Sequence, residues 1–239
     1  MHNGSRVAVI ILAAGNSTRM GDGVNKQYLC IKDKPVLART VEVFEYNQYV
    51  DKIVLVVNES DIEYCRREIV EKFKFEKVVK VVGGGKERRE SCQNGIKALL
   101  TDNDEDRAGT EMVMIHDGAR PLVTQEIIDN TIAGISEHGV CCVCVPVKDT
   151  IKLSDENKHI TGTTIRSRTY AAQTPQGFRM EILREIYNKE VLTDATDDSQ
   201  IAEYYGYLPK IIDGSYENIK ITTKEDIYLA ENIILNRGY

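Results

Sequence analysis

The sequence has little of what marks membrane-spanning, aromatic-rich or basic proteins. Its 239 residues contain no Trp, five Pro and only 7% aromatic residues. A membrane-spanning helix needs about 20 consecutive apolar residues, and the apolar run at residues 7–12 is too short and lacks the layout of a signal peptide. We therefore expect a cytoplasmic protein with no membrane partner.

The charge balance is slightly acidic rather than basic. Lys and Arg number 31, Asp and Glu number 37, and the formal net charge is −6. A protein that binds duplex DNA usually carries a basic face, so we expect no nucleic-acid partner. A small anionic ligand remains possible, because a few local Arg and Lys side chains can hold it.

Cysteines give no sign of a disulfide framework or a metal site. Cys141, Cys142 and Cys144 lie among valines, which favours small buried side chains in a strand over metal ligands. Reduced thiols agree with the cytoplasm. A chain of this length buries enough surface to fold without disulfides.

Short apolar runs alternate with helix-like stretches through the first two thirds of the chain. Strands are predicted at residues 7–12, 53–57, 78–82, 112–115 and 140–147, and helices at residues 35–46, 61–73, 87–100 and 124–137. The strand runs are nearly continuous, as expected where helices cover both faces of a sheet. This alternation predicts an α/β fold with a doubly wound, mostly parallel sheet in a single domain, residues 1–239. Ligands of such sheets bind at the carboxyl ends of the strands.

The pattern changes after Pro146. Residues 148–153 and 159–172 are rich in Thr and other polar residues, with a turn at 154–158 between them. We predict a projecting β-hairpin arm over 148–172 whose apolar side is buried against a partner subunit. The alternative is a hairpin folded back on its own domain. Beyond the arm, helices are predicted at 180–187, 199–205 and 224–235, and strands at 207–212 and 218–222.

The first chemically informative segment, residues 12–21, follows the first predicted strand. Gly15 permits a tight turn, and a loop that leaves a strand presents backbone N–H groups to phosphate oxygens. Arg19 and Lys26 add positive charge. The segment is neither the dinucleotide-binding glycine fingerprint nor a Walker A loop. A plain strand-to-helix turn with solvated cations is the alternative.

Two further segments follow later strands. Residues 83–91 contain three consecutive glycines and then Ser91, which suits close contact with a base or sugar, although a flexible turn is equally compatible. Asp117 follows the strand at 112–115 and offers a hard carboxylate oxygen to a divalent cation, although it could also cap the loop. His116 must point to the opposite side of that strand, and we interpret it as structural.

The remaining segments are individually weak signals. Arg166 can be a surface charge, and Lys220 lies in a predicted strand with no preferred side. Residues 196–198, Thr-Asp-Asp, are most simply a helix N-cap with acidic residues at the positive end of the helix dipole.

Taken together, the segments resemble the 2-C-methyl-D-erythritol 4-phosphate cytidylyltransferases of the non-mevalonate isoprenoid pathway. The resemblance covers nearly the whole chain, and its motifs occur in the family's order. They are Ala-Ala-Gly, Arg-Met-Gly and Lys-Gln (13–27), Gly-Gly-x-Glu-Arg with Ser (84–91), His-Asp-x-Ala-Arg-Pro (116–121), Val-Pro-Val-Lys-Asp-Thr (145–150), Gln-Thr-Pro-Gln-x-Phe (173–178), Thr-Asp-Asp (196–198) and Asn-Ile-Lys-Ile-Thr (218–222).

The resemblance implies a Rossmann-like nucleotidyltransferase fold and a set of residue roles. Arg19 and Lys26 would hold the triphosphate of CTP and stabilise charge on the reacting phosphorus, and Arg166 and Lys220 would aim the attacking phosphate. Cytidine would be lined by Ala13, Ala14, Gly15, Gly85, Lys86 and Ser91. Methylerythritol phosphate would be positioned by Asp117, Arg120, Thr150, Thr174 and Thr196. Asp117 would also meet Mg²⁺, and the arm would join a homodimer and supply some of these residues across it.

Three alternatives remain at this point. A cytidylyltransferase that uses a pentitol phosphate such as ribitol 5-phosphate shares the first loop. A nucleotide-binding regulatory module without turnover would not need cations on both sides of a phosphorus. A nicotinamide-dependent dehydrogenase lacks the glycine fingerprint, although Glu42 and Glu45 could mimic its ribose-binding acid.

Overall fold

A seven-stranded sheet forms the centre of the molecule. The computed structural model describes residues 1–2, 4–15, 25–101, 109–189 and 195–238. The strand order is β11-β7-β10-β6-β1-β4-β5, and every neighbouring pair is parallel except the two that involve β10. The strands are β1 (Val7–Ala13), β4 (Val50–Val57), β5 (Val78–Gly83), β6 (Met112–Asp117), β7 (Val140–Pro146), β10 (Tyr170–Arg179) and β11 (Lys210–Asp213). The predicted α/β, doubly wound, mostly parallel sheet is confirmed.

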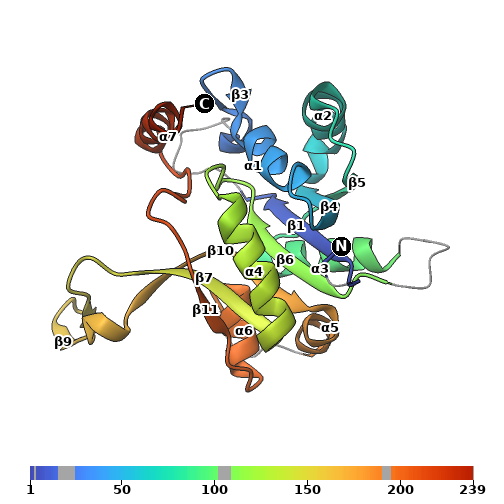
Figure 1. Ribbon diagram of the computed structural model, residues 1–239. Helices are drawn as coiled ribbons and strands as arrows, with labels where there is room; N and C mark the ends of the chain where they lie inside the picture. Colours follow the sequence, from blue (N-terminus) through green and yellow to red (C-terminus); the bar gives the residue numbers. More distant parts are fainter. Residues whose placement is uncertain (3, 16–24, 102–108, 190–194, 239) are drawn as a thin grey trace.

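Helices cover both faces of this sheet (Figure 1). They are α1 (Val36–Glu45), α2 (Ile62–Cys65), α3 (Arg88–Leu100), α4 (Gln125–His138), α5 (Met180–Asn188), α6 (Asp198–Tyr204) and α7 (Lys224–Asn236). No helix among the described residues has both the length and the apolar character needed to cross a membrane.

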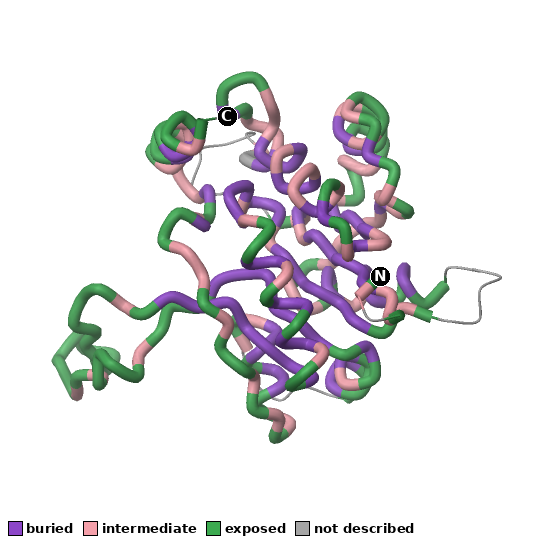
Figure 2. The backbone as a smooth tube through the Cα atoms, in the orientation of Figure 1, coloured by how far each residue is buried: buried purple, intermediate pink, exposed green. Residues whose placement is uncertain are grey.

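The continuous apolar strands are buried on both sides, as their sequences predict (Figure 2). On β1, Val9 and Ile11 join a cluster with α1 and α4, whereas Ala8 and Ile10 face α3, α5 and α6. Cys141, Cys142 and Cys144 are buried in β7 as free thiols, so the prediction of small buried strand residues is confirmed. In a third hydrophobic cluster, α7 packs against the short hairpin of β2 (Cys30–Ile31) and β3 (Lys34–Pro35).

Helix starts follow the expected capping chemistry. Thr124 accepts a hydrogen bond from the N–H of Ile127 at the start of α4. Asp197 accepts one from the N–H of Gln200 at the start of α6, so the cap predicted within residues 196–198 is confirmed. The helix predicted over 61–73 is less regular than expected. After α2 it winds as the wider π-helical turn η4 (Arg66–Glu71).

Two predictions about strands were wrong. Residues 173–178 were not expected in a strand, yet they lie in β10, between β6 and β7. Their polar composition and Pro175 are untypical of a central strand, so the sequence pattern does not predict one. The register against β7 breaks between Ala172 and Gln176, around that proline. Residues 218–222 were predicted as a strand but form no ladder. Their backbone is tied instead by a bond from the Ile221 N–H to the carbonyl of Ala119.

The segment predicted as an arm leaves the sheet after β7 and projects away from it (Figure 1). It contains the antiparallel pair β8 (Lys152–Ser154) and β9 (Ile160–Thr163), followed by a 3₁₀ turn, η5 (Arg166–Arg168). Residues 170–172 already belong to β10. At the base of the arm, Tyr216 donates a hydrogen bond to the carbonyl of Pro146, at 2.6 Å.

Candidate active site

One cavity of about 270 Å³ opens at the carboxyl ends of β1, β4 and β6. It lies where the chain order of the strands reverses, the usual ligand position in doubly wound sheets. It is lined by eight of the residues that the sequence singled out: Ala13, Ala14, Gly15, Gly85, Lys86, Ser91, Asp117 and Lys220. Four separate segments of the sequence therefore meet at one place.

The wall predicted to hold the nucleotide is built by close backbone packing. The N–H of Gly84 donates to the carbonyl of Val57 at 2.7 Å, and a Cβ atom at Gly84 would come within 2.3 Å of the Ala14 Cβ. Any larger residue would push the two loops apart. Ser91 accepts from the N–H of Gly85 at 3.1 Å, and Gln27 donates to the carbonyl of Ala13, also at 3.1 Å.

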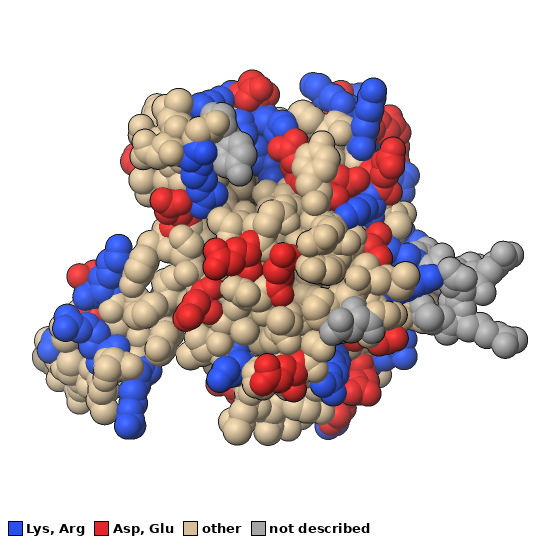
Figure 3. Space-filling view, in the orientation of Figure 1, with Lys and Arg blue, Asp and Glu red and all other residues tan. Residues whose placement is uncertain are grey.

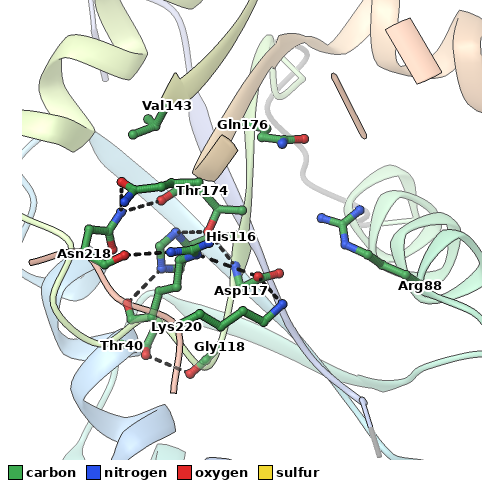
Figure 4. A network of polar contacts seen from close by, with 12 residues as sticks. Thr40, Arg88, His116, Asp117, Gly118, Val143, Thr174, Gln176, Asn218 and Lys220 are labelled. Carbon is green, nitrogen blue, oxygen red and sulfur yellow. Dashed lines mark hydrogen bonds and ion pairs between the residues drawn. The ribbon is translucent and has the colours of Figure 1, made fainter. Parts of the chain in front are cut away.

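Asp117 is the charged centre of the opposite wall (Figure 4). Its Oδ2 lies 2.7 Å from Lys220 Nζ and 3.8 Å from Arg120 Nε. Burial alone would raise the pKa of this carboxyl, but the positive charges of Lys220, Arg88 and Arg120 lower it to about 2. Asp117 is therefore an ionised, hard oxygen donor at neutral pH.

His116 points away from the cavity into the protein. Its Nε2 lies 3.1 Å from the carbonyl oxygen of Arg120, and its Nδ1 lies 3.1 Å from Thr174 Oγ1. A carbonyl can only accept, so Nε2 carries the proton and the Thr174 hydroxyl donates to Nδ1. Burial lowers the pKa of His116 to about 4. A neutral, fully bonded imidazole agrees with the structural role predicted for it.

Hydrogen bonds made by Thr174 and Arg120 fix the backbone around Asp117. Thr174 Oγ1 accepts from the backbone N–H of Asp117 at 3.0 Å. Arg120 donates to the carbonyl of Asn218 at 2.7 Å, and the side-chain amide of Asn218 donates to the carbonyl of Thr174 at 2.9 Å. These bonds fix the segment that carries Lys220, which explains how a stretch without strand pairing still places that lysine.

The other predicted site residues lie elsewhere or outside the description. Thr150, Arg166 and Thr196 are exposed and do not line the cavity. Arg19 falls outside the described residues, and the backbone of Lys26 is described within a 3₁₀ turn but its side chain is not.

Sequence reasoning missed one cation of the cavity, Arg88. It begins α3, lines the cavity, and pairs with the fully buried Asp198, the two groups being 2.6 Å apart. Two features of the sequence could have indicated this ion pair. Arg88 follows the run of glycines at 83–85, and Asp198 is a second acidic residue directly after the helix cap Asp197. The N-cap interpretation treated Asp198, like Asp197, as an acidic residue at the positive end of the helix dipole and gave it no ion-pair partner.

A glycine-rich loop after β1, a second one before α3, and clustered cations around a carboxylate define a nucleotidyltransferase of the α/β class. A family model described as IspD, 2-C-methyl-D-erythritol 4-phosphate cytidylyltransferase, matches residues 7–236. The chain therefore belongs to the 2-C-methyl-D-erythritol 4-phosphate cytidylyltransferase family.

Individual relatives agree with this assignment. A protein of that name from Alkaliphilus oremlandii is 44% identical over 99% of this chain and 98% of its own length. One from Clostridium kluyveri is 43% identical over 96% of this chain and 97% of its own. The crystal structure of 4-diphosphocytidyl-2C-methyl-D-erythritol synthase from Anaerococcus prevotii superposes with a TM-score of 0.83 at 31% identity, covering 97% of this chain and 96% of that one.

Proposed function

We propose that this protein transfers the cytidylyl group of CTP to 2-C-methyl-D-erythritol 4-phosphate, giving 4-diphosphocytidyl-2-C-methyl-D-erythritol and pyrophosphate. The observation that carries the proposal is the meeting of both glycine-rich loops, Asp117 and Lys220 in one cavity of a chain from this family. The cavity presents small residues from both glycine-rich segments beside the charged side chains of Lys86, Arg88, Asp117 and Lys220. That arrangement suits a nucleotide whose phosphates face a second anionic substrate.

The reaction joins an oxygen of the acceptor's phosphate monoester to the α-phosphorus of CTP. As that bond forms, the bond from the α-phosphorus to the pyrophosphate oxygen breaks, and pyrophosphate leaves with the electron pair. A phosphate monoester has a second pKa near ~6, so the nucleophile is largely a dianion at neutral pH. No general base is required, which agrees with a neutral, buried His116 beside the site.

Catalysis then consists of positioning and charge stabilisation. Lys220, held by Asp117 at 2.7 Å, would orient the acceptor phosphate. Arg19 and Lys26 would bind the triphosphate and offset the negative charge that builds up at the α-phosphorus. Lys220, already held by Asp117, would need little rearrangement during the reaction.

Asp117 would supply one carboxylate ligand to Mg²⁺. The described residues contain no cluster of three or more His, Cys, Asp or Glu side chains. Mg²⁺ at nucleotide sites, however, needs only one or two carboxylates and takes its other ligands from phosphates and water, and the ionised Asp117 supplies one. When bound, the ion would neutralise phosphate charge. Pyrophosphate release should stop in EDTA and return with added Mg²⁺; release that persists in EDTA would contradict this part of the proposal.

A homodimer formed through the arm would complete the site. The arm exposes Leu153, Ile160 and Ile165, with 54%, 67% and 63% of their surface accessible. Lys and Arg side chains gather along it (Figure 3). Apolar side chains on a projecting hairpin favour contact with a second copy. In that dimer, Thr150 and Arg166 of one subunit would serve the cavity of the other.

We also place the enzyme in the cytoplasm. All six cysteines are free and five of them are buried, which suits a reducing compartment. Fractionation of the source cells tests this placement, and recovery of the protein from the secreted fraction would contradict it.

A pyrophosphate-release assay tests the function. Purified protein with Mg²⁺ and CTP is given 2-C-methyl-D-erythritol 4-phosphate, ribitol 5-phosphate or no acceptor, with ATP and UTP replacing CTP as controls. Release should require CTP and the methylerythritol phosphate. Turnover with ribitol 5-phosphate alone would assign the protein to the alternative acceptor, a pentitol phosphate.

A further inference from the structure

A buried ion pair joins Arg88, at the start of α3, to Asp198, at the start of α6. Asp198 has no exposed surface, and its Oδ2 lies 2.6 Å from Arg88 Nη2. The hydroxyl of Tyr187, on α5, donates to its other oxygen, Oδ1. A buried carboxylate is costly to desolvate unless it is paired and hydrogen-bonded, and Asp198 meets both conditions.

The backbone around Asp198 is held as firmly as its side chain. Gln176 Oε1, on β10, accepts from the N–H of Asp198 at 3.0 Å and from the N–H of Ser199 at 2.9 Å. The carboxylate is therefore fixed by three elements, β10, α5 and α3. Because the Asp198 carboxylate is held in one position, it also fixes the position of the Arg88 guanidinium that pairs with it.

Arg88 has a different environment on its two sides. One side meets Asp198, whereas 32% of its side chain is exposed where it lines the cavity. In Figure 4 its guanidinium points across the cavity toward Asp117 and Lys220. The charge of Arg88 contributes to the lowered pKa of Asp117, which agrees with that orientation. A guanidinium has five N–H donors, so a single carboxylate partner leaves donors for a phosphate.

We propose that Arg88 is a phosphate-binding cation of this cavity and that Asp198 is the positioning residue that holds it there. Asp198 lies two residues after Thr196, which is expected to contact the acceptor. The Arg88–Asp198 pair thus links the segment at residues 83–91, expected to bind the nucleotide, to the segment at residues 196–198, expected to bind the acceptor. The identity of the phosphates, from CTP or from the methylerythritol phosphate, rests on the proposed function; the presence of a phosphate-binding cation does not.

Binding calorimetry on the full chain tests this proposal without requiring turnover. CTP and 2-C-methyl-D-erythritol 4-phosphate are titrated separately, with Mg²⁺, into wild type, Arg88→Met, Arg88→Lys, Asp198→Asn and the double variant. Arg88→Met should weaken the binding of one of the two compounds about 10- to 100-fold, the size expected for a charge-assisted hydrogen bond. The compound whose binding is weakened is the one whose phosphate Arg88 contacts. Arg88→Lys should recover part of the loss.

The double variant decides whether Asp198 acts through Arg88. Asp198→Asn alone should weaken the binding of the same compound. In the double variant, Asp198→Asn should cause no loss of affinity beyond that of Arg88→Met. The double variant also removes both buried charges, so it avoids the unpaired carboxylate that could unfold Arg88→Met. Arg67→Met, which removes an exposed arginine paired with Glu68, serves as the control and should bind both compounds as wild type does.

Three results would overturn the proposal. Folded Arg88→Met, or the folded double variant, could bind both compounds within about twofold of wild type. Asp198→Asn could weaken binding equally in the presence and absence of Arg88. Weakened binding in Arg67→Met to the same degree would show a general electrostatic effect. Failure of the proposed function is seen separately, as wild-type protein that binds CTP yet releases no pyrophosphate with the acceptor.

Discussion

Lys220 Nζ lies 2.7 Å from Asp117 Oδ2, which brings the segment after β11 onto the carboxyl end of β6. The pair does two things at once. It keeps Asp117 ionised, with a pKa of about 2, and it points a half-exposed ammonium into the cavity. Arg120 and Thr174 fix the backbone on either side of the pair. A cation held in this way is already placed when a phosphate arrives.

Mixed dimers test the proposal that each site takes residues from both subunits of a homodimer. Arg166→Ala and Lys220→Ala should each lose most of their activity, because each homodimer lacks one acceptor-aiming cation in both sites. When the two variants are mixed and exchange subunits, half of the dimers are mixed and each has one intact site. Activity should therefore return to about a quarter of wild type.

The rate of pyrophosphate release before and after mixing measures this recovery. Co-purification of differently tagged Arg166→Ala and Lys220→Ala subunits demonstrates subunit exchange, and wild type mixed with Lys220→Ala, in which each wild-type subunit keeps an intact site in any pairing, should show no change in activity. If mixing the two inactive variants restores nothing while exchange is demonstrated, Arg166 and Lys220 do not serve the same site across a dimer.

Arg19→Ala and Lys26→Ala should each lower kcat about 10²- to 10³-fold, as the removal of one oxyanion-stabilising donor does in other enzymes. Steady-state kinetics measure the loss, and thermal unfolding confirms that each protein is folded. Arg66→Ala, which removes an exposed arginine paired with Glu63, is the matched control and should leave kcat unchanged. Turnover near the wild-type rate in either loop variant would exclude that residue from catalysis.

His116 should make the protein less stable in mild acid. Burial lowers its pKa from 6.5 to about 4 in the folded state. Between those values the unfolded chain binds a proton that the folded chain does not, so the free energy of unfolding falls as the pH drops from 6.5 towards 4. The shift corresponds to about 3 kcal/mol.

Urea unfolding of wild type and His116→Gln at pH 7, 6, 5 and 4 measures this contribution. The variant should be less stable at pH 7, because packing and hydrogen bonds are lost, yet lose less stability on acidification. Parallel curves for the two proteins over that range would show that His116 titrates equally in both states.

Much of the fold was predictable because burial on both faces leaves continuous apolar runs such as those at β1 and β7. The carboxyl ends of parallel strands share one edge of a sheet, so Gly15, Gly85 and Asp117 could be expected at that edge because each follows a predicted strand. Recognition of Lys220 came from the motif around it, since its segment has no strand pairing of its own.

The features that escaped prediction depend on contacts between distant segments. Strand β10 is polar and contains Pro175, and it gains its place only by fitting between β6 and β7. Asp197 and Asp198 are neighbours at a helix start, where local rules give both the same role. Only the fold separates them: one caps α6, and the other is buried against Arg88.

The destination of isotopic label from CTP tests the central claim most directly. The protein is incubated with Mg²⁺, 2-C-methyl-D-erythritol 4-phosphate and CTP labelled with ³²P at either the α- or the γ-phosphorus, and the products are separated. Attack at the α-phosphorus should place α-label in the sugar-linked product and γ-label only in pyrophosphate. Label from the γ-position in the sugar product, or α-label confined to free cytidine nucleotides, would contradict cytidylyl transfer.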